Sequence, residues 1–193
     1  MDFMRILTDF PDVFGVVLAG GASSRMGHDK ARIRVAGEPL ILRQLRLLSA
    51  AGVLRRAVAV SQSPPTGQLD EIPPDVGILR DEQPNQGPLA GIERALSAIQ
   101  PAETHVLVLA VDLPRLTPDF IQSLLLQARP GIGVVPSLAG RLEPLIAVYP
   151  VEARAEVVAR LGRGEGSVQN CLRAGLREGW MMEHPVVLTR RCS

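Results

Sequence analysis

Three short segments of the sequence contain residue types suited to binding, in turn, a phosphate, a divalent metal ion and a flat base. The first, VVLAGGASSRMGHDK (residues 16–30), joins an apolar run to a polar loop that holds two glycines, Arg25 and Lys30. Lys30 is the only lysine among the 21 basic residues, so a chain that otherwise uses arginine has one compact, strongly hydrated charge here. Such a charge is suited to a phosphate. Gly20 and Gly21 let the backbone turn tightly and present bare N–H groups to an anion.

The glycine loop does not match the best-known phosphate-binding patterns. His28 stands where the P-loop motif needs a lysine after its last glycine, and the spacing G-x-G-x-x-G is absent. A purely structural strand-to-helix turn is the alternative interpretation. Arg25 and Lys30 together favour phosphate binding.

An aspartate ends the most apolar predicted strand. Asp112 follows HVLVLAV (residues 105–111) and precedes Leu113 and Pro114. A carboxylate in this position is a natural ligand for Mg²⁺, which takes one or two protein carboxylates together with phosphate oxygens and water. The alternative is a side-chain cap of the following turn. A phosphate-binding loop and an acidic strand end in one crevice favour the metal and indicate phosphoryl or nucleotidyl transfer.

The third segment contains Asp81 and the sequence GPLAG (residues 87–91) at the start of a predicted helix. Gly87 and Gly91 around Pro88 would form a rigid loop on which a flat base can rest. The alternative is an ordinary helix start, of which the same residues are typical. The three histidines lack metal-ligand spacing, and Ser23 and Ser24 have no nearby His–Asp arrangement for nucleophilic catalysis.

The elements that must position these residues alternate along the chain. Apolar strands and amphipathic helices predict an α/β fold: a single Rossmann-like domain over residues 1–193, with a mostly parallel sheet, helices on both faces and a flexible extension at residues 1–12. In such sheets a ligand binds beyond the carboxyl ends of the strands, where all three segments fall. The predicted strands are 14–19, 31–35, 56–61, 77–79, 105–111, 132–136, 144–149 and 185–188. The predicted helices are 39–51, 89–99, one capped by Thr117, 151–161 and a shorter one after Ser167.

Composition excludes several classes of function. A net charge of +1 argues against a nucleic-acid surface, and no apolar run reaches the length of roughly 20 residues that spans a membrane. Acidic residues in the first 15 positions leave no uninterrupted apolar segment for a signal peptide. Cys171 and Cys192 are too few for a disulfide framework and are expected to be incidental thiols in the cytoplasm. Trp180, Met181 and Met182 are expected to pack in or beside the core.

Three segments resemble, in order and spacing, the molybdenum cofactor guanylyltransferase family. They are LAGGASSRMGHDK (18–30), LRDEQPNQGPLAGI (79–92) and VDLP (111–114), and the likeness spans roughly residues 14–150. The resemblance implies a nucleotide-diphospho-sugar-transferase-like fold. It implies transfer of GMP from Mg·GTP to the terminal phosphate of molybdopterin, with release of pyrophosphate. Proteins that deliver molybdopterin or accept the finished cofactor are the implied partners.

The resemblance also implies roles for individual residues. Arg25 and Lys30 would bind the phosphates, and Asp112 would hold Mg²⁺. The segment RLEPLIAVY (residues 141–149) resembles the strand that closes the acceptor side. The remaining nucleotide-binding positions would be Leu18, Ala19, Gly20 and Gly21 through backbone groups, together with Ser61, Asp81, Gly87, Pro88 and Leu89.

Two features depart from the family pattern. Ser61 stands where members commonly have asparagine, so one hydroxyl replaces an amide. The segment VVLTRRCS (residues 186–193) holds no counterpart of the Asn-rich segment that members carry near their ends. Two alternative functions therefore stay open. One is a CTP-dependent relative, whose loop reads LAAG where this chain reads LAGG, so Gly20 favours guanine. The other is a nucleotide-binding module without transferase activity.

Overall fold

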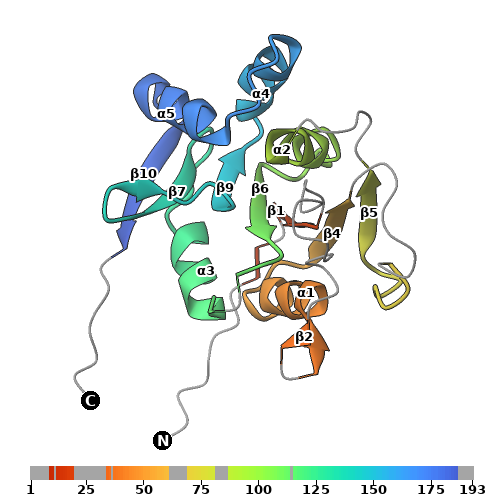
Figure 1. Cartoon of the computed structure of the whole chain (residues 1–193). Coiled ribbons are helices and arrows are strands. Elements are labelled where there is room, and N and C mark those ends of the chain that lie inside the picture. Colours follow the sequence, from red (N-terminus) through yellow and green to blue (C-terminus); the bar gives the residue numbers. More distant parts are fainter. Residues whose placement is uncertain are drawn as a thin grey trace, which may run out of the picture.

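A sheet of mostly parallel strands runs through the molecule, with helices on both faces (Figure 1). The computed structural model describes residues 9–10, 12–19, 34–35, 37–60, 69–80, 87–113 and 115–186. The strands are β1 (Val13–Leu18), β2 (Arg34–Val35), β3 (Glu38–Pro39), β4 (Arg55–Val60), β5 (Gly77–Arg80), β6 (His105–Ala110), β7 (Gly133–Leu138), β8 (Arg141–Leu142), β9 (Ile146–Pro150) and β10 (Met181–Val186). The helices are α1 (Leu40–Ala50), α2 (Pro88–Ser97), α3 (Pro118–Leu125), α4 (Ala153–Gly162) and α5 (Val168–Glu178). The predicted α/β class is confirmed.

The strand directions gather most carboxyl ends at one edge of the sheet. The order is β10-β7-β9-β6-β1-β4-β5, with β8 paired to β7, while β2 and β3 form a separate small hairpin. β6, β1, β4 and β5 pair in parallel, as do β7 and β10. β9 runs antiparallel to both β6 and β7, which joins the two parallel parts with their carboxyl ends on the same side. A ligand site is expected along that edge.

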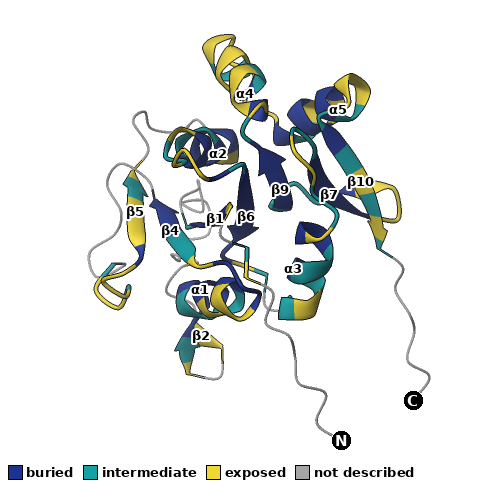
Figure 2. Cartoon of the chain, turned by 180° about the vertical axis from the view of Figure 1, so that it is seen from behind, coloured by how far each residue is buried: buried dark blue, intermediate teal, exposed yellow. Residues whose placement is uncertain are grey.

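The core forms two layers because the central strands are buried on both faces. Helices α2, α4 and α5 cover one face and α1 and α3 cover the other (Figure 1). Along β1, Val16 and Leu18 contact the first layer, and Val17 contacts the second. Figure 2 shows β1, β6, β7 and β9 as buried and the outer strands β5 and β10 as partly exposed. Continuous apolar runs in the sequence therefore mark the central strands.

Three details differ from the sequence-based expectation. Phe10 and Asp12, placed in a flexible extension, are anchored: the Phe10 N–H donates to Gly52 O at 2.9 Å, and Asp12 O accepts from Thr104 N at 2.9 Å. The last strand spans 181–186 rather than 185–188, because it lies at the sheet edge, where exposed and half-buried residues alternate. The helix after Ser167 is eleven residues long and so not shorter than α4, with ten.

Within the described ranges, none of the helices is long and apolar enough to cross a membrane.

Candidate active site

The ends of β1 and β6 bring two of the predicted segments together. Leu18 pairs with Ala110 in β6 and with Ala59 in β4. Beyond the last pairs, the Val111 N–H donates to Leu18 O at 3.3 Å, and the Ala19 N–H donates to Ala59 O at 2.8 Å. The chain that leads into the glycine loop and the turn that carries Asp112 therefore leave the sheet side by side. Six of the predicted site residues lie outside the described residues: Gly20, Gly21, Arg25, Lys30, Ser61 and Asp81.

The start of α2 lies against the same strand end. Gly87, the N-cap, has φ 70° and ψ −170°, a conformation that is essentially restricted to glycine. Pro88 occupies the first turn, and among the described residues no side chain caps the helix. A Cβ on Gly91 would stand 3.0 Å from Leu18 Cδ2, so this glycine lets α2 approach β1 closely. The Leu89 side chain is fully buried in the core, so only its backbone can serve the predicted nucleotide contact.

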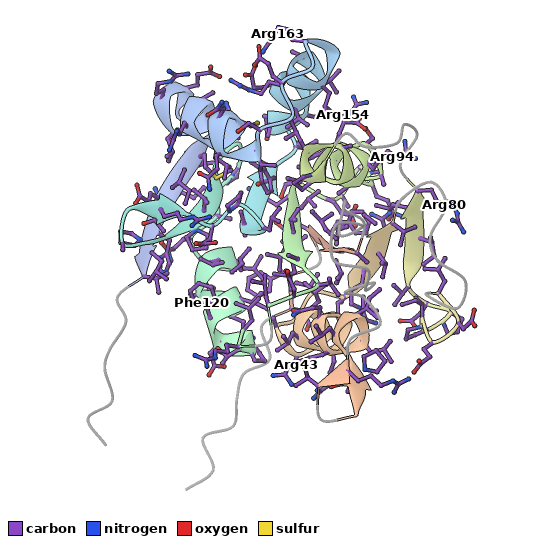
Figure 3. All side chains as sticks on the ribbon, in the orientation of Figure 1. Arg43, Arg80, Arg94, Phe120, Arg154 and Arg163 are labelled. Carbon is purple, nitrogen blue, oxygen red and sulfur yellow. The ribbon has the colours of Figure 1, made fainter. Side chains whose placement is uncertain are left out.

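Asp112 lines a cavity of about 420 Å³ at the carboxyl edge of the sheet. Phe120 of α3, labelled in Figure 3, lies on one wall. Glu143, from the turn before β9, and Arg115 also line the cavity. The other lining residues are mostly apolar: Leu113, Leu116, Pro136, Leu138, Ile146 and Val186. The cavity thus suits a ligand with a flat apolar body and polar groups at its margin.

Sequence reasoning identified Asp112 in this cavity but missed its opposite wall. Glu143 lies within the segment RLEPLIAVY, which the sequence indicated as a whole without assigning a role to this residue. Arg115 comes directly after the VDLP segment. Phe120 comes from α3 and Val186 from β10, so only the folding of the chain brings them to the same cavity. For Glu143, the available sequence signal was the resemblance of the segment RLEPLIAVY as a whole. No sequence signal indicated that Val186 lines the cavity.

A buried tyrosine holds the Glu143 side of the cavity. Tyr149 in β9 is fully buried, and its hydroxyl donates to Pro144 O at 2.8 Å. Burial raises the pKa of the Tyr149 phenol well above its usual range, so it stays a donor. The backbone of Glu143 is fixed as well, because its N–H donates to Pro136 O at 2.8 Å.

The other reactive side chains that the structure describes serve the fold. His105 is buried at the start of β6, as predicted, with Nε2 at 3.1 Å from Arg129 O and 3.3 Å from Ile132 O. Burial raises the pKa of the Cys171 thiol to about 11, so it is a neutral core residue at physiological pH. Met181 is buried, and Trp180 packs beside the core, as expected.

The donor set fits a metal that arrives with phosphate. Among the described residues, no group of three or more His, Cys, Asp or Glu side chains is arranged to hold a metal ion by itself. Asp112 is an exposed carboxylate at a strand end. Mg²⁺ commonly takes one or two protein carboxylates and completes its octahedron with phosphate oxygens and water. Asp112 therefore fits Mg²⁺ bound together with a nucleotide.

Comparison with known proteins points to the same chemistry. The family described as "MobA-like NTP transferase domain" matches residues 15–179. A probable molybdenum cofactor guanylyltransferase of Opitutus terrae is 40% identical over 170 residues, which cover 85% of this chain and 79% of that protein. A molybdenum cofactor guanylyltransferase of Rhizobium johnstonii is 33% identical over 161 residues, which cover 81% of this chain and 72% of the relative.

The fold is shared with a solved structure from Archaeoglobus fulgidus. That protein is described as molybdopterin-guanine dinucleotide biosynthesis protein A. It superposes with a TM-score of 0.68 at 20% identity, covering 90% of this chain and 83% of the other. The two chains therefore share the overall fold.

Proposed function

The chain belongs to the MobA-like NTP transferase family, and is thus a nucleotidyltransferase, and we propose that it transfers GMP from Mg·GTP to molybdopterin. The observation that carries the proposal is the placement of Asp112. It lies where the ends of β1 and β6 meet and also lines the cavity of about 420 Å³. One carboxylate therefore stands between the expected nucleotide loop and a space large enough for an acceptor. Relatives named molybdenum cofactor guanylyltransferase support this choice of substrates.

Nucleotide binding is assigned to the edge formed by β1, β4, β5 and α2. Backbone groups of residues 18–21 would hold the nucleotide, and Arg25 and Lys30 would contact its phosphates. Ser61, Asp81 and the α2 start at residues 87–89 would meet the guanosine. Gly87 supports this role through its glycine-only backbone conformation, which places a turn without a side chain at the helix start.

Asp112 would hold Mg²⁺ against the phosphates of GTP. When bound, the ion neutralises phosphate charge and stabilises the charge that develops on the leaving group. The exposed carboxylate of Asp112 can meet such an ion without the cost of desolvating a buried acid.

The reaction is an in-line displacement at the α-phosphorus of GTP. An oxygen of the terminal phosphate of molybdopterin forms a bond to this phosphorus, and the bond to the β-phosphate oxygen breaks. Pyrophosphate leaves with that bonding pair, while Arg25 and Lys30 offset its growing negative charge. The acceptor oxygen is already anionic, so neither a general base nor a protein nucleophile is required.

The cavity on the far side of Asp112 would receive the acceptor. Phe120, Leu138 and Ile146 offer apolar surface to a flat pterin ring. The carboxylate of Glu143 can accept hydrogen bonds from ring N–H groups. Proteins that deliver molybdopterin or take up the finished dinucleotide are the proposed partners.

A titration tests the nucleotide half of the proposal. GTP and CTP, each with Mg²⁺, are titrated calorimetrically into the wild type, into Lys30→Ala and into Arg163→Ala as a control. Arg163 is an exposed residue paired with Glu165 at the far end of α4. We expect GTP to bind more tightly than CTP, and binding to be lost in Lys30→Ala alone. Preference for CTP would identify a cytidylyl relative, the second candidate. Binding of neither nucleotide would contradict the proposal.

A further inference from the structure

Helix α1 carries one polar side chain on its buried face. Its buried positions are Leu40, Ile41, Gln44, Leu45 and Leu48, and Gln44 is 0% exposed. Four of the five are apolar and pack in the core layer beneath the sheet. Burying an amide costs free energy unless its hydrogen bonds are replaced. An apolar residue would fill this position without that cost, so the amide requires an explanation.

The amide of Gln44 bonds the turn that carries Asp112. Gln44 Nε2 donates to Leu113 O at 2.9 Å and makes a longer contact of 3.4 Å with Val111 O. These are the carbonyl groups on either side of Asp112. On its other side the same turn is bonded to the sheet, since the Val111 N–H donates to Leu18 O. The backbone around Asp112 is thus held from both α1 and β1.

The second polar atom of the amide, Oε1, is buried as well. No residue that the structure describes forms a hydrogen bond with Gln44 Oε1. A buried acceptor without a protein partner offsets part of the gain from the bonds made by Nε2. What Gln44 supplies and an apolar residue would not is the pair of contacts from Nε2 to the carbonyl groups on either side of Asp112.

We propose that Gln44 is a positioning residue that sets the direction of the Asp112 carboxylate toward the metal–nucleotide complex. Gln44 acts through the backbone of residues 111–113 and touches neither metal nor substrate. The inference rests on the proposed function, in which Asp112 holds the metal. Groups that orient metal ligands typically affect metal affinity or activity by about 10–100-fold, so the effect is measurable.

The test compares two glutamine-to-methionine variants. Gln44→Met keeps the length of the side chain but removes the donor. Gln122→Met is the matched control, because Gln122 Nε2 also donates to a backbone carbonyl, Ala51 O at 3.4 Å, between α3 and the end of α1. Binding of Mn²⁺ in the presence of GTP is measured by water proton relaxation. GTP binding without metal and thermal unfolding are measured in parallel.

We expect Gln44→Met to weaken Mn²⁺ binding by about tenfold or more, with metal-free GTP binding unchanged within about twofold. Gln122→Met should leave both unchanged. In turnover, the Gln44 variant should need more metal and show a lower kcat at an unchanged KM for GTP. Equal Mn²⁺ affinity in Gln44→Met and the wild type would overturn the positioning role alone. Failure of the wild type to bind Mn²⁺ with GTP would overturn both proposals.

A second variant decides the matter if Gln44→Met does not fold. In Gln44→Glu the side chain keeps its shape, and only its protonated form can donate to a carbonyl. The Mn²⁺ affinity of this variant, expressed relative to the wild type at each pH, should therefore recover as the pH falls. A ratio that stays constant with pH would overturn the role of the donor.

Discussion

The hydroxyl of Tyr149 donates a hydrogen bond of 2.8 Å to the carbonyl oxygen of Pro144, five residues earlier in the chain. The bond closes the turn between Glu143 and β9, at one wall of the cavity. Tyr149→Phe removes only the hydroxyl, so Pro144 O loses this hydrogen bond. We expect a loss of about 1 kcal/mol in the free energy of unfolding, measured by urea denaturation. An unchanged urea midpoint would show that water replaces the bond at no cost.

The contact between β7 and β9 depends on a glycine. A Cβ on Gly133 would overlap Val148 O and stand 2.7 Å from Pro150 Cδ. Since both are held in the sheet, we expect Gly133→Ala to destabilise the protein by about 3 kcal/mol or more. Gly162→Ala is the control, because a Cβ at that position, near the end of α4, would meet no atom of the described residues within 4 Å apart from its chain neighbours and the backbone of its own helix. The control should be neutral or more stable by thermal unfolding, and equal losses in both variants would refute the steric explanation.

The buried thiol of Cys171 predicts how stability changes in alkali. Its pKa in the folded protein is about 11, while an exposed thiol titrates near 8.5. Between these two pKa values the thiol loses its proton in the unfolded chain and keeps it in the folded chain. Raising the pH therefore stabilises the unfolded state relative to the folded state. From pH 7.5 to 10 we expect the wild type to lose about 2 kcal/mol more than Cys171→Ala does. Urea denaturation at the two pH values measures this difference, and parallel losses in the two proteins would exclude the thiol as the cause.

Asp112→Asn tests the metal ligand directly. We expect metal-dependent release of pyrophosphate to fall below detection, because a neutral amide binds Mg²⁺ poorly. The exposed position of Asp112 predicts a change in stability within about 0.5 kcal/mol. Asp119→Asn, in the first turn of α3, serves as the matched carboxylate control and should retain turnover. Normal turnover of Asp112→Asn would remove this residue from the mechanism.

Much of the scaffold could be predicted because its signals are local. The central strands are apolar throughout, since both of their faces are covered. Thr117 was expected to cap a helix, and its Oγ1 accepts from Phe120 N at 3.3 Å. The rule that ligands bind at the carboxyl ends of parallel strands selects the loop after Ala19 and the turn after Val111 as candidate places, and the pairing of β1 with β6 brings the two together.

The missed features depend on contacts between distant parts of the chain. In the sequence, Gln44 is a polar residue on an otherwise apolar helix face. Its hydrogen-bond partner, the carbonyl group of Leu113, comes 69 residues later in the chain. Glu143 lines the cavity because β9, which follows it, inserts between β6 and β7. The edge strand β10 lacks the apolar run of a central strand, so its bounds were misplaced.

One measurement tests the proposed function most directly. The purified protein is incubated with molybdopterin, Mg²⁺ and GTP labelled at the α-phosphate, and the label is followed. We predict that the label moves from GTP to molybdopterin, with one pyrophosphate released per transfer, and that neither CTP nor the Asp112→Asn variant gives this product. Label that stays in GTP while the wild type binds both substrates would contradict guanylyl transfer.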